Sequence, residues 1–326
     1  MSNAKPLRWI GIPPGLRDEL GPEAARGGAL ERRVLDALTA SGYRQIATPE
    51  LEYYDLFIHA GLPLPQEAMV KLEDRFGRMC VMRPDSTIPA ARVAATKLRG
   101  DPMPLKLCYA QPVFRVQPDG RVEKYGQAGV EHIGRAADTA SVDAEIVRLL
   151  LNTLRAVGLA TLHVEIGHAG LIRSMIGTLG LGPDKDAELL SAFERRDFAV
   201  VSDILSEAPD RQEAEALERL SMLSGIRDFD EAMGFISNPE AQDMLQELKT
   251  LSNHFTSENI TLDGSMVSRM DYYTGLIFRV YVPGATRSVA VGGRYDRLME
   301  RFGIDAPAIG FVLDLDAIAE LEGLIV

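Results

Sequence analysis

The sequence is poor in cysteine and tryptophan, and its cysteines do not form a metal or redox motif. The 326 residues include two cysteines and one tryptophan. Cys80 and Cys108 each stand inside an apolar stretch and form no Cys-x-x-Cys pair, which argues against a zinc knuckle or a thioredoxin-like site. A disulfide between them stays open at this point, but two buried thiols in a reducing compartment are favoured.

Long hydrophobic runs and an excess of positive charge are also missing. No run approaches 18 apolar residues, and residues 1–8 lack the apolar core of a signal peptide, so we expect no membrane span and a cytoplasmic location. Acidic residues outnumber basic ones by 47 to 35, and the formal net charge is -12. This charge argues against a protein whose main task is to grip a nucleic-acid backbone.

Several common catalytic motifs are absent from the sequence. There is no Gly-x-Gly-x-x-Gly after a strand, no Walker-type loop and no Gly-x-Ser-x-Gly elbow. The five histidines show no i, i+4 helical spacing with a third ligand nearby. We therefore predict neither a metal site nor a bound cofactor.

The periodicity of apolar residues predicts an α+β fold. Helices are expected over 23–40 and 141–157, and residues 168–254 read almost wholly as helix. Strands are expected at 43–49, 79–82, 105–110, 113–116, 162–166, 260–262, 277–282 and 288–291, with a strand-to-helix pattern at 308–318. This order favours an antiparallel sheet flanked by helices and interrupted by a helical insertion.

Four polar islands interrupt the strand-like segments, and they lie at 83–87, 114–131, 268–275 and 292–296. Gln127, Gly129 and Glu131 alternate, so they point to one side of a strand and could form the floor of a small-ligand site. Arg115 could pair with a carboxylate or phosphate. An internal salt-bridge network is the alternative for these residues. An aromatic corner of the core is the alternative for 271–275, and 292–296 is interpreted as a tight turn before a helix.

Taken in this order, the islands resemble those of the class II aminoacyl-tRNA synthetases and, among them, histidyl-tRNA synthetase. The segments that carry the resemblance are 14–18 (the opening signature), 46–49 (motif 1), 114–131 (motif 2), 269–275 and 292–296 (two histidine-specific signatures) and 310–318 (motif 3). The resemblance implies one synthetase-like domain over 8–326, with the helical insertion at about 168–254 and no anticodon-binding domain.

The sequence departs from the synthetases where ATP would bind. Ala317 occupies the position of the motif 3 arginine that holds ATP, and Asp314 replaces a family glycine. Glu123 stands where a basic residue is usual, in a motif 2 loop that is shorter than in the synthetases. One cation is lost and one anion gained, which disfavours the electrostatic stabilisation of phosphates.

The amino-acid side of the synthetase pocket is better preserved. By resemblance, the residues that match it are Asp85 (in place of a glutamate), Thr87, Arg115, Gln127, Glu131, Arg269, Tyr272 and Tyr273. A histidine pocket without an ATP clamp resembles one paralogous family, the regulatory subunits of ATP phosphoribosyltransferase. The resemblance implies a non-catalytic protein that takes part in the first step of histidine biosynthesis and conveys feedback regulation by histidine.

The same resemblance implies the partners. They are a short-form catalytic ATP phosphoribosyltransferase chain in a hetero-octamer, a second copy bound through motif 1 and histidine as effector, with no tRNA and no membrane. Whether histidine binds the inherited pocket or a subunit interface stays open, as does the surface that meets the catalytic chain. A ligase that makes an adenylate for a non-tRNA acceptor is the alternative function, and a tRNA-binding module is disfavoured.

Overall fold

An eight-stranded sheet forms the centre of the computed structural model, which describes residues 11–61, 64–135, 138–222, 228–267 and 272–322. The strand order is β1-β5-β6-β11-β10-β9-β7-β8. The strands are β1 (Arg44–Gln45), β5 (Leu105–Val116), β6 (Val122–Ile133), β7 (His163–His168), β8 (Asn259–Leu262), β9 (Leu276–Tyr281), β10 (Ala290–Arg294) and β11 (Ala308–Asp314). Neighbours pair in antiparallel fashion except β1 with β5 and β7 with β8, which are parallel.

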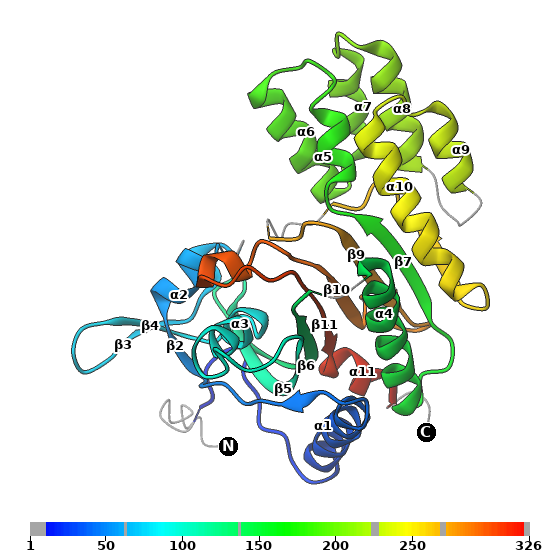
Figure 1. The fold of residues 1–326 in the computed structure, drawn as a ribbon. Coiled ribbons are helices and arrows are strands. Elements are labelled where there is room, and N and C mark those ends of the chain that lie inside the picture. Colours follow the sequence, from blue (N-terminus) through cyan, green and yellow to red (C-terminus); the bar gives the residue numbers. More distant parts are fainter. Residues whose placement is uncertain (1–10, 62–63, 136–137, 223–227, 268–271, 323–326) are drawn as a thin grey trace, which may run out of the picture.

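Helices cover one face of this sheet, called the back face below. They are α1 (Pro22–Ala40), α4 (Thr139–Ala156) and α11 (Leu315–Glu322), which pack against one another and against β5, β6 and β11 (Figure 1). Ala128 and Val130 of β6 are buried in the same core as Leu30 and Val34 of α1. Because side chains alternate along a strand, Gln127, Gly129 and Glu131 must lie on the opposite face, called the front face.

A smaller sheet and short helices pack at the front of the molecule. Its strands are β2 (Leu51–Tyr53), β3 (Lys71–Glu73) and β4 (Met79–Met82), in the order β2-β4-β3. Beside them lie α2 (Tyr54–Ala60), α3 (Thr87–Thr96) and two 3₁₀ turns, η2 (Gln66–Ala68) and η4 (Met299–Phe302). Leu107 of β5 is buried with Val81 and Ile88 in this second core.

A block of helices separates β7 from β8 in the sequence. It contains α5 (Leu171–Ile176), α6 (Pro183–Arg195), α7 (Phe198–Ser206), α8 (Arg211–Met222), α9 (Asp228–Phe235), α10 (Pro239–Ser252) and the turn η3 (Asn253–Phe255). Figure 1 shows most of this block beyond one end of the sheet, while α10 runs back along β7 and α4. Pro183 and Pro239 begin their helices, and the Asn238 side chain accepts hydrogen bonds from two α10 amides.

The structure confirms the α+β antiparallel sheet with a helical insertion and corrects several boundaries. Residues 105–116 form one strand rather than two, because Pro112 lies beyond the short β1, on an edge where no neighbour needs its missing N–H. The strand expected over 43–49 shrinks to Arg44–Gln45. Gly292–Arg294 belong to strand β10 rather than to a turn.

Arg83 joins the segment expected as motif 1 to the front face. Its side chain is only 1% exposed, and its guanidinium donates to the carbonyl oxygens of Thr48 (2.8 Å), Pro49 (2.8 Å) and Pro112 (2.6 Å). The Arg83 carbonyl accepts a hydrogen bond from the Phe114 amide at 2.9 Å. Within the described residues, its guanidinium partners are all uncharged oxygens.

The structure bears on the expectation for the two cysteines. Cys80 and Cys108 are free and buried, so the interpretation as two buried thiols is confirmed.

Among the described helices, none is both long and apolar enough to cross a bilayer.

Candidate functional site

Glu131 is the centre of the front-face site. Its side chain is 1% exposed, and it accepts hydrogen bonds from the hydroxyl groups of Tyr109 (2.9 Å) and Tyr295. Burial raises the pKa of the Glu131 carboxyl to about 7, although hydrogen bonds from Tyr295, Thr87 and Tyr109 act in the opposite direction. A buried carboxylate of this kind would gain from a cationic ligand, because opposite charge offsets the cost of burial.

Glycines give Glu131 the space that it needs. Gly310 lies directly opposite on β11, and a Cβ there would come within 2.3 Å of Glu131 Oε2. Gly293 is the next residue in this cross-strand row, and its missing Cβ leaves room for the Tyr273 ring. The space in front of Gly129, expected as a ligand floor, is taken by the Tyr109 hydroxyl, which would lie 2.9 Å from a Cβ.

Three tyrosine rings form a wall beside Glu131. The centroid of Tyr272 lies 5.1 Å from that of Tyr273 and 5.8 Å from that of Tyr295, and Tyr273 and Tyr295 are 6.5 Å apart. Such tilted and edge-to-face pairs are the favourable aromatic geometry. The region around Tyr272 is therefore both an aromatic corner and a wall of the site, so the two interpretations from the sequence coincide.

Asp85 and Thr87 reach the site from the N-terminal end of α3, and both are buried. The Asp85 carboxylate accepts a hydrogen bond from the Ile88 amide at 2.9 Å, as a helix-capping residue does. Burial raises the pKa of Asp85, while the Ile88 amide and the charge of Arg115 act against this rise. Asp85 and Glu131 thus place two carboxyl groups in one poorly solvated region.

Arg115 and Gln127 lie at the other end of the site. The Arg115 Nε donates to the Pro84 carbonyl at 2.9 Å. Both side chains line a cavity of about 260 Å³ together with Tyr125, Arg287 and Asp314. Gln127 Oε1 is buried and has no hydrogen-bond donor within the described part of the chain. This cavity can accept a polar group in addition to whatever Glu131 contacts.

The structure brings together seven of the eight residues expected from the sequence. Six lie around Glu131 or its neighbouring cavity: Asp85, Thr87, Arg115, Gln127, Tyr272 and Tyr273. The eighth, Arg269, lies outside the described residues. Tyr109 and Tyr295 were missed, although both donate to Glu131. Tyr109 was hidden in an apolar strand, and Tyr295 stood in an island that was interpreted as structural.

The three residues that depart from the synthetase pattern where ATP would bind make contacts within the fold. The Asp314 carboxylate accepts a hydrogen bond from the Ala317 amide at 2.8 Å, which caps α11, and pairs with Arg287 Nε at 2.8 Å. Ala317 is buried in the back-face core. Glu123 accepts a hydrogen bond from the Tyr125 hydroxyl. Asp314 therefore has its own cation, which reduces the negative charge that it brings to the cavity.

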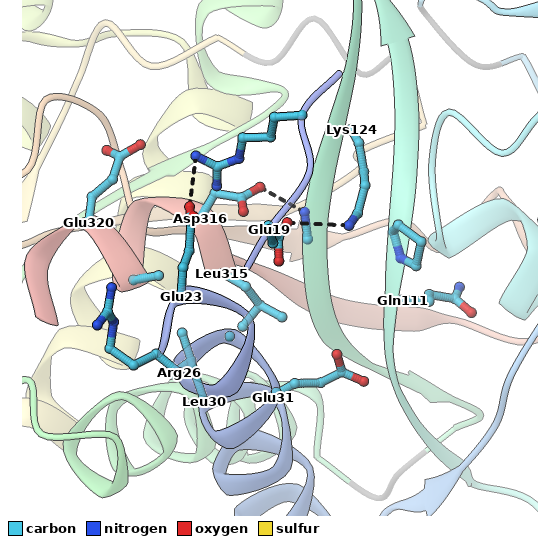
Figure 2. Close-up of a pocket in the computed structure, with 16 residues that line it drawn as sticks. Glu19, Glu23, Arg26, Leu30, Glu31, Gln111, Lys124, Leu315, Asp316 and Glu320 are labelled. Carbon is cyan, nitrogen blue, oxygen red and sulfur yellow. Dashed lines mark hydrogen bonds and ion pairs between the residues drawn. The ribbon is translucent and has the colours of Figure 1, made fainter. Parts of the chain in front are cut away.

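A second cavity, of about 340 Å³, lies on the back face between the N-terminal segment, α1 and α11 (Figure 2). Two ion pairs join side chains of its lining. Arg17 lies 3.4 Å from Glu23, and Lys124 lies 3.5 Å from Glu19. Asp316 accepts a hydrogen bond from the Gly126 amide at 2.8 Å. This region is explained by exposed ion pairs, which contribute little energy each.

Comparison with known proteins identifies the family. The model of the histidyl-tRNA synthetase family matches residues 15–318. The ATP phosphoribosyltransferase regulatory subunit of Desulforamulus reducens is 34% identical over 328 residues, covering 97% of this chain and 81% of that protein. The ATP phosphoribosyltransferase regulatory subunit of Clostridium novyi is 32% identical over 318 residues, covering 94% of this chain and 75% of that protein. The chain belongs to the family of ATP phosphoribosyltransferase regulatory subunits.

Solved structures of related proteins share the fold of this chain. An ATP phosphoribosyltransferase regulatory subunit/histidyl-tRNA synthetase from Bacillus halodurans superimposes with a TM-score of 0.88 at 29% identity, covering 97% of this chain and 84% of that one. A histidine–tRNA ligase subunit from Alicyclobacillus acidocaldarius gives 0.83 at 26% identity, covering 97% and 98%. The class II synthetase-like fold expected from the sequence is thereby confirmed.

Proposed function

We propose that this chain acts as a non-catalytic regulatory subunit of ATP phosphoribosyltransferase, in the first step of histidine biosynthesis. The names of its relatives support the assignment. The observation that carries it is a contrast between two regions: the Glu131 carboxylate keeps its tyrosine partners on the front face, while Ala317, at the motif 3 arginine position, is buried in the back-face core and offers ATP no cation. The proposed pathway places the protein in the cytoplasm.

Assembly with a short-form catalytic chain tests this proposal. We expect the purified chain to raise the activity of a short-form phosphoribosyltransferase and to make that activity sensitive to histidine. Native mass spectrometry of the mixture would show whether the complex is the expected hetero-octamer. Failure of the two chains to associate, or to alter activity, would refute the proposed function.

The adenylate-forming ligase is the second candidate, because Arg115 and Arg287 both line the cavity beside Gln127 and could contact phosphate groups there. Amino-acid-dependent exchange between ATP and pyrophosphate separates the two functions. A regulatory subunit gives no exchange with histidine or any other amino acid. Exchange above background would establish the ligase and displace our assignment.

We further propose that histidine occupies the front-face site. Glu131 and Tyr273 would contact the imidazole ring, while Arg115 and Arg269 would hold the carboxylate. Glu131→Gln should weaken histidine binding by about 1–3 kcal/mol, as expected when a buried polar partner is lost. Glu300→Gln, on the exposed side of η4, is the matched control for calorimetry. Equal affinity in both variants would move the effector site to a subunit interface.

We also propose that two copies of this chain associate through the segment around motif 1. Leu51, Tyr53, Phe76 and Met79 of the small sheet and its turn are each more than two-fifths exposed, and the Arg78 guanidinium lies over the rings of both Tyr53 and Phe76. Exposed apolar patches mark protein–protein contact surfaces. Phe76→Glu should convert a dimer into a monomer in light scattering, whereas Phe198→Glu on α7 should not. A dimer that survives Phe76→Glu places the interface elsewhere.

A further inference from the structure

A cavity of about 630 Å³ lies on the back-face side of the sheet where the helical block meets the body of the molecule. It is bounded by the start of α4, the end of β7 and the second half of α10. We call it the junction cavity. A volume in this range accommodates a small organic ligand. It shares no lining residue with the front-face cavity beside Arg115.

The junction cavity is strongly acidic. Four carboxylates line it, two from the start of α4 and two from α10: Asp138, Asp143, Asp243 and Glu247. Arg294 is the one lining cation among the described residues. Its guanidinium is already bound, with Nε 3.1 Å from Asp143 and Nη1 3.1 Å from Asp296. The unbalanced charge therefore favours a cationic ligand.

His168 supplies a donor on a largely buried ring, and this donor has no acceptor within hydrogen-bond distance among the described residues. Its side chain is 7% exposed, and it lines the cavity at the end of β7. Nδ1 accepts a hydrogen bond from the Gly170 amide at 3.2 Å, so the ring proton sits on Nε2. Nε2 lies 3.6 Å from Glu247, beyond hydrogen-bond distance, and has no other acceptor among the described residues.

The ring of His168 is neutral, because burial lowers the pKa of its imidazole to about 4. The Nε2–H group therefore needs an acceptor rather than a counterion. The Glu247 side chain is 73% exposed, and partial burial raises its pKa more than the nearby Arg294 lowers it. One donor and several carboxylates thus face the same space.

Other ligand classes fit less well. A metal ion is disfavoured, because no three His, Cys, Asp or Glu residues in the described chain are close enough to hold one. An anion would meet four carboxylates, and the Ala140 amide near the start of α4 already donates to the Asp138 carboxylate at 3.1 Å. A zwitterion would bring a carboxylate into the same repulsion.

We propose that the junction cavity binds a small amino alcohol, with its ammonium group between the carboxylates of α10 and α4 and its hydroxyl oxygen accepting from His168 Nε2. The ligand would contact both the helical block and the sheet. Binding would therefore restrain α10 against β7 and α4, independently of the function proposed for the front face.

The test uses four five-carbon probes and the full-length protein. They are 5-amino-1-pentanol, pentylamine, 1-pentanol and 5-aminopentanoate, titrated by ligand-observed NMR at low-millimolar concentration. We expect the amino alcohol to bind more tightly than pentylamine, and the neutral alcohol and the zwitterion to bind not at all. Absence of amine binding, or stronger binding of the zwitterion or of inorganic phosphate, would overturn the proposal.

Substitutions on α10 test whether the amino alcohol binds in the junction cavity. Asp243 and Glu247 are exposed on α10, so Asp243→Asn and Glu247→Gln should leave the fold intact while weakening the amino alcohol about two- to fivefold each. Glu240→Gln, on the same helix but outside the cavity, is the charge-matched control and should leave affinity unchanged. Equal effects of all three would show nonspecific attraction to an acidic surface and overturn the proposed site.

The donor role of His168 is tested by a difference between ligands. His168→Phe should remove the advantage of the amino alcohol over pentylamine and leave pentylamine binding unchanged. Because the ratio is taken within one variant, a general loss of stability does not produce this result. A ratio equal to that of the unmodified protein would refute the contact with Nε2.

Discussion

Replacement of Glu131 by glutamine should alter the pH dependence of stability in a defined direction. The carboxyl group has a folded-state pKa of about 7 against 4.5 for a solvated glutamate. A carboxyl group whose pKa is higher in the folded state favours folding while it is protonated. Its contribution is fully present below about pH 4.5, is lost as the pH rises through about 7, and is constant above that value.

The size of the effect follows from the two pKa values. A difference of about 2.5 pH units, at about 1.4 kcal/mol for each unit, amounts to about 3 kcal/mol between pH 4.5 and pH 8. The glutamine variant cannot ionise, so its stability should lack this decline. Exchanging a carboxylate for an amide also weakens the bonds from Tyr109 and Tyr295, at a cost of about 1 kcal/mol. We therefore expect the variant to be more stable than the unmodified protein by about 2 kcal/mol at pH 8, and no more stable at pH 4.5.

Urea unfolding followed by circular dichroism measures this difference. The protein concentration must be fixed, because any self-association shifts the transition. The urea dependence of the free energy should stay the same in both proteins, since the surface exposed on unfolding is the same. Glu300→Gln, a substitution on the surface, should follow the unmodified protein at every pH. A constant difference between Glu131→Gln and the unmodified protein from pH 4.5 to pH 8 would show that the carboxyl is not perturbed and refute the reasoning.

Three further substitutions test contacts elsewhere in the fold. Gly310→Ala places a Cβ 2.3 Å from the Val130 carbonyl oxygen and should destabilise the protein by about 3 kcal/mol in urea unfolding, whereas Gly234→Ala in α9 meets no atom within 4 Å and should not. Arg294→Met leaves Asp143 buried without its partner and should cost about 3 kcal/mol in the same assay; an unchanged midpoint would contradict the pairing. Asp314→Ala removes the cap of α11 and should lower stability by about 1 kcal/mol, seen as a reduced melting temperature.

Much of the architecture could be predicted from periodicity alone. The alternating run at Val164 and Ile166, the helix expected over 141–157 and the strand-to-helix pattern expected over 308–318 all appear with small shifts of their bounds, because burial on one face leaves a clear pattern. Pairing between distant strands leaves no such pattern. The parallel partner of β1 and the position of Gly292 in a central strand depend on contacts across the sheet, so the sequence did not reveal them.

The sequence predicted the polar members of the site and two of its tyrosines, Tyr272 and Tyr273, but it did not reveal Tyr109 and Tyr295. Gln127 and Glu131 stood out because polar side chains on one face of a strand-like segment are not needed for folding. Tyr109 looked like an ordinary core residue, since only its hydroxyl group distinguishes a donor to Glu131 from a packed ring. The capping role of Asp314 was likewise invisible, because it depends on Arg287 and α11 being close in space.

The buried Arg83 couples the local unfolding of two segments. Its guanidinium holds three carbonyl oxygens, from Thr48, Pro49 and Pro112, and separating them would leave a buried charge with no partner. The segment before β2 and the middle of β5 should therefore lose protection against amide hydrogen exchange together, as one cooperative unit, rather than fray one after the other. A contact at residues 48–49 and a ligand beside Arg115 would then slow exchange in each other's segment.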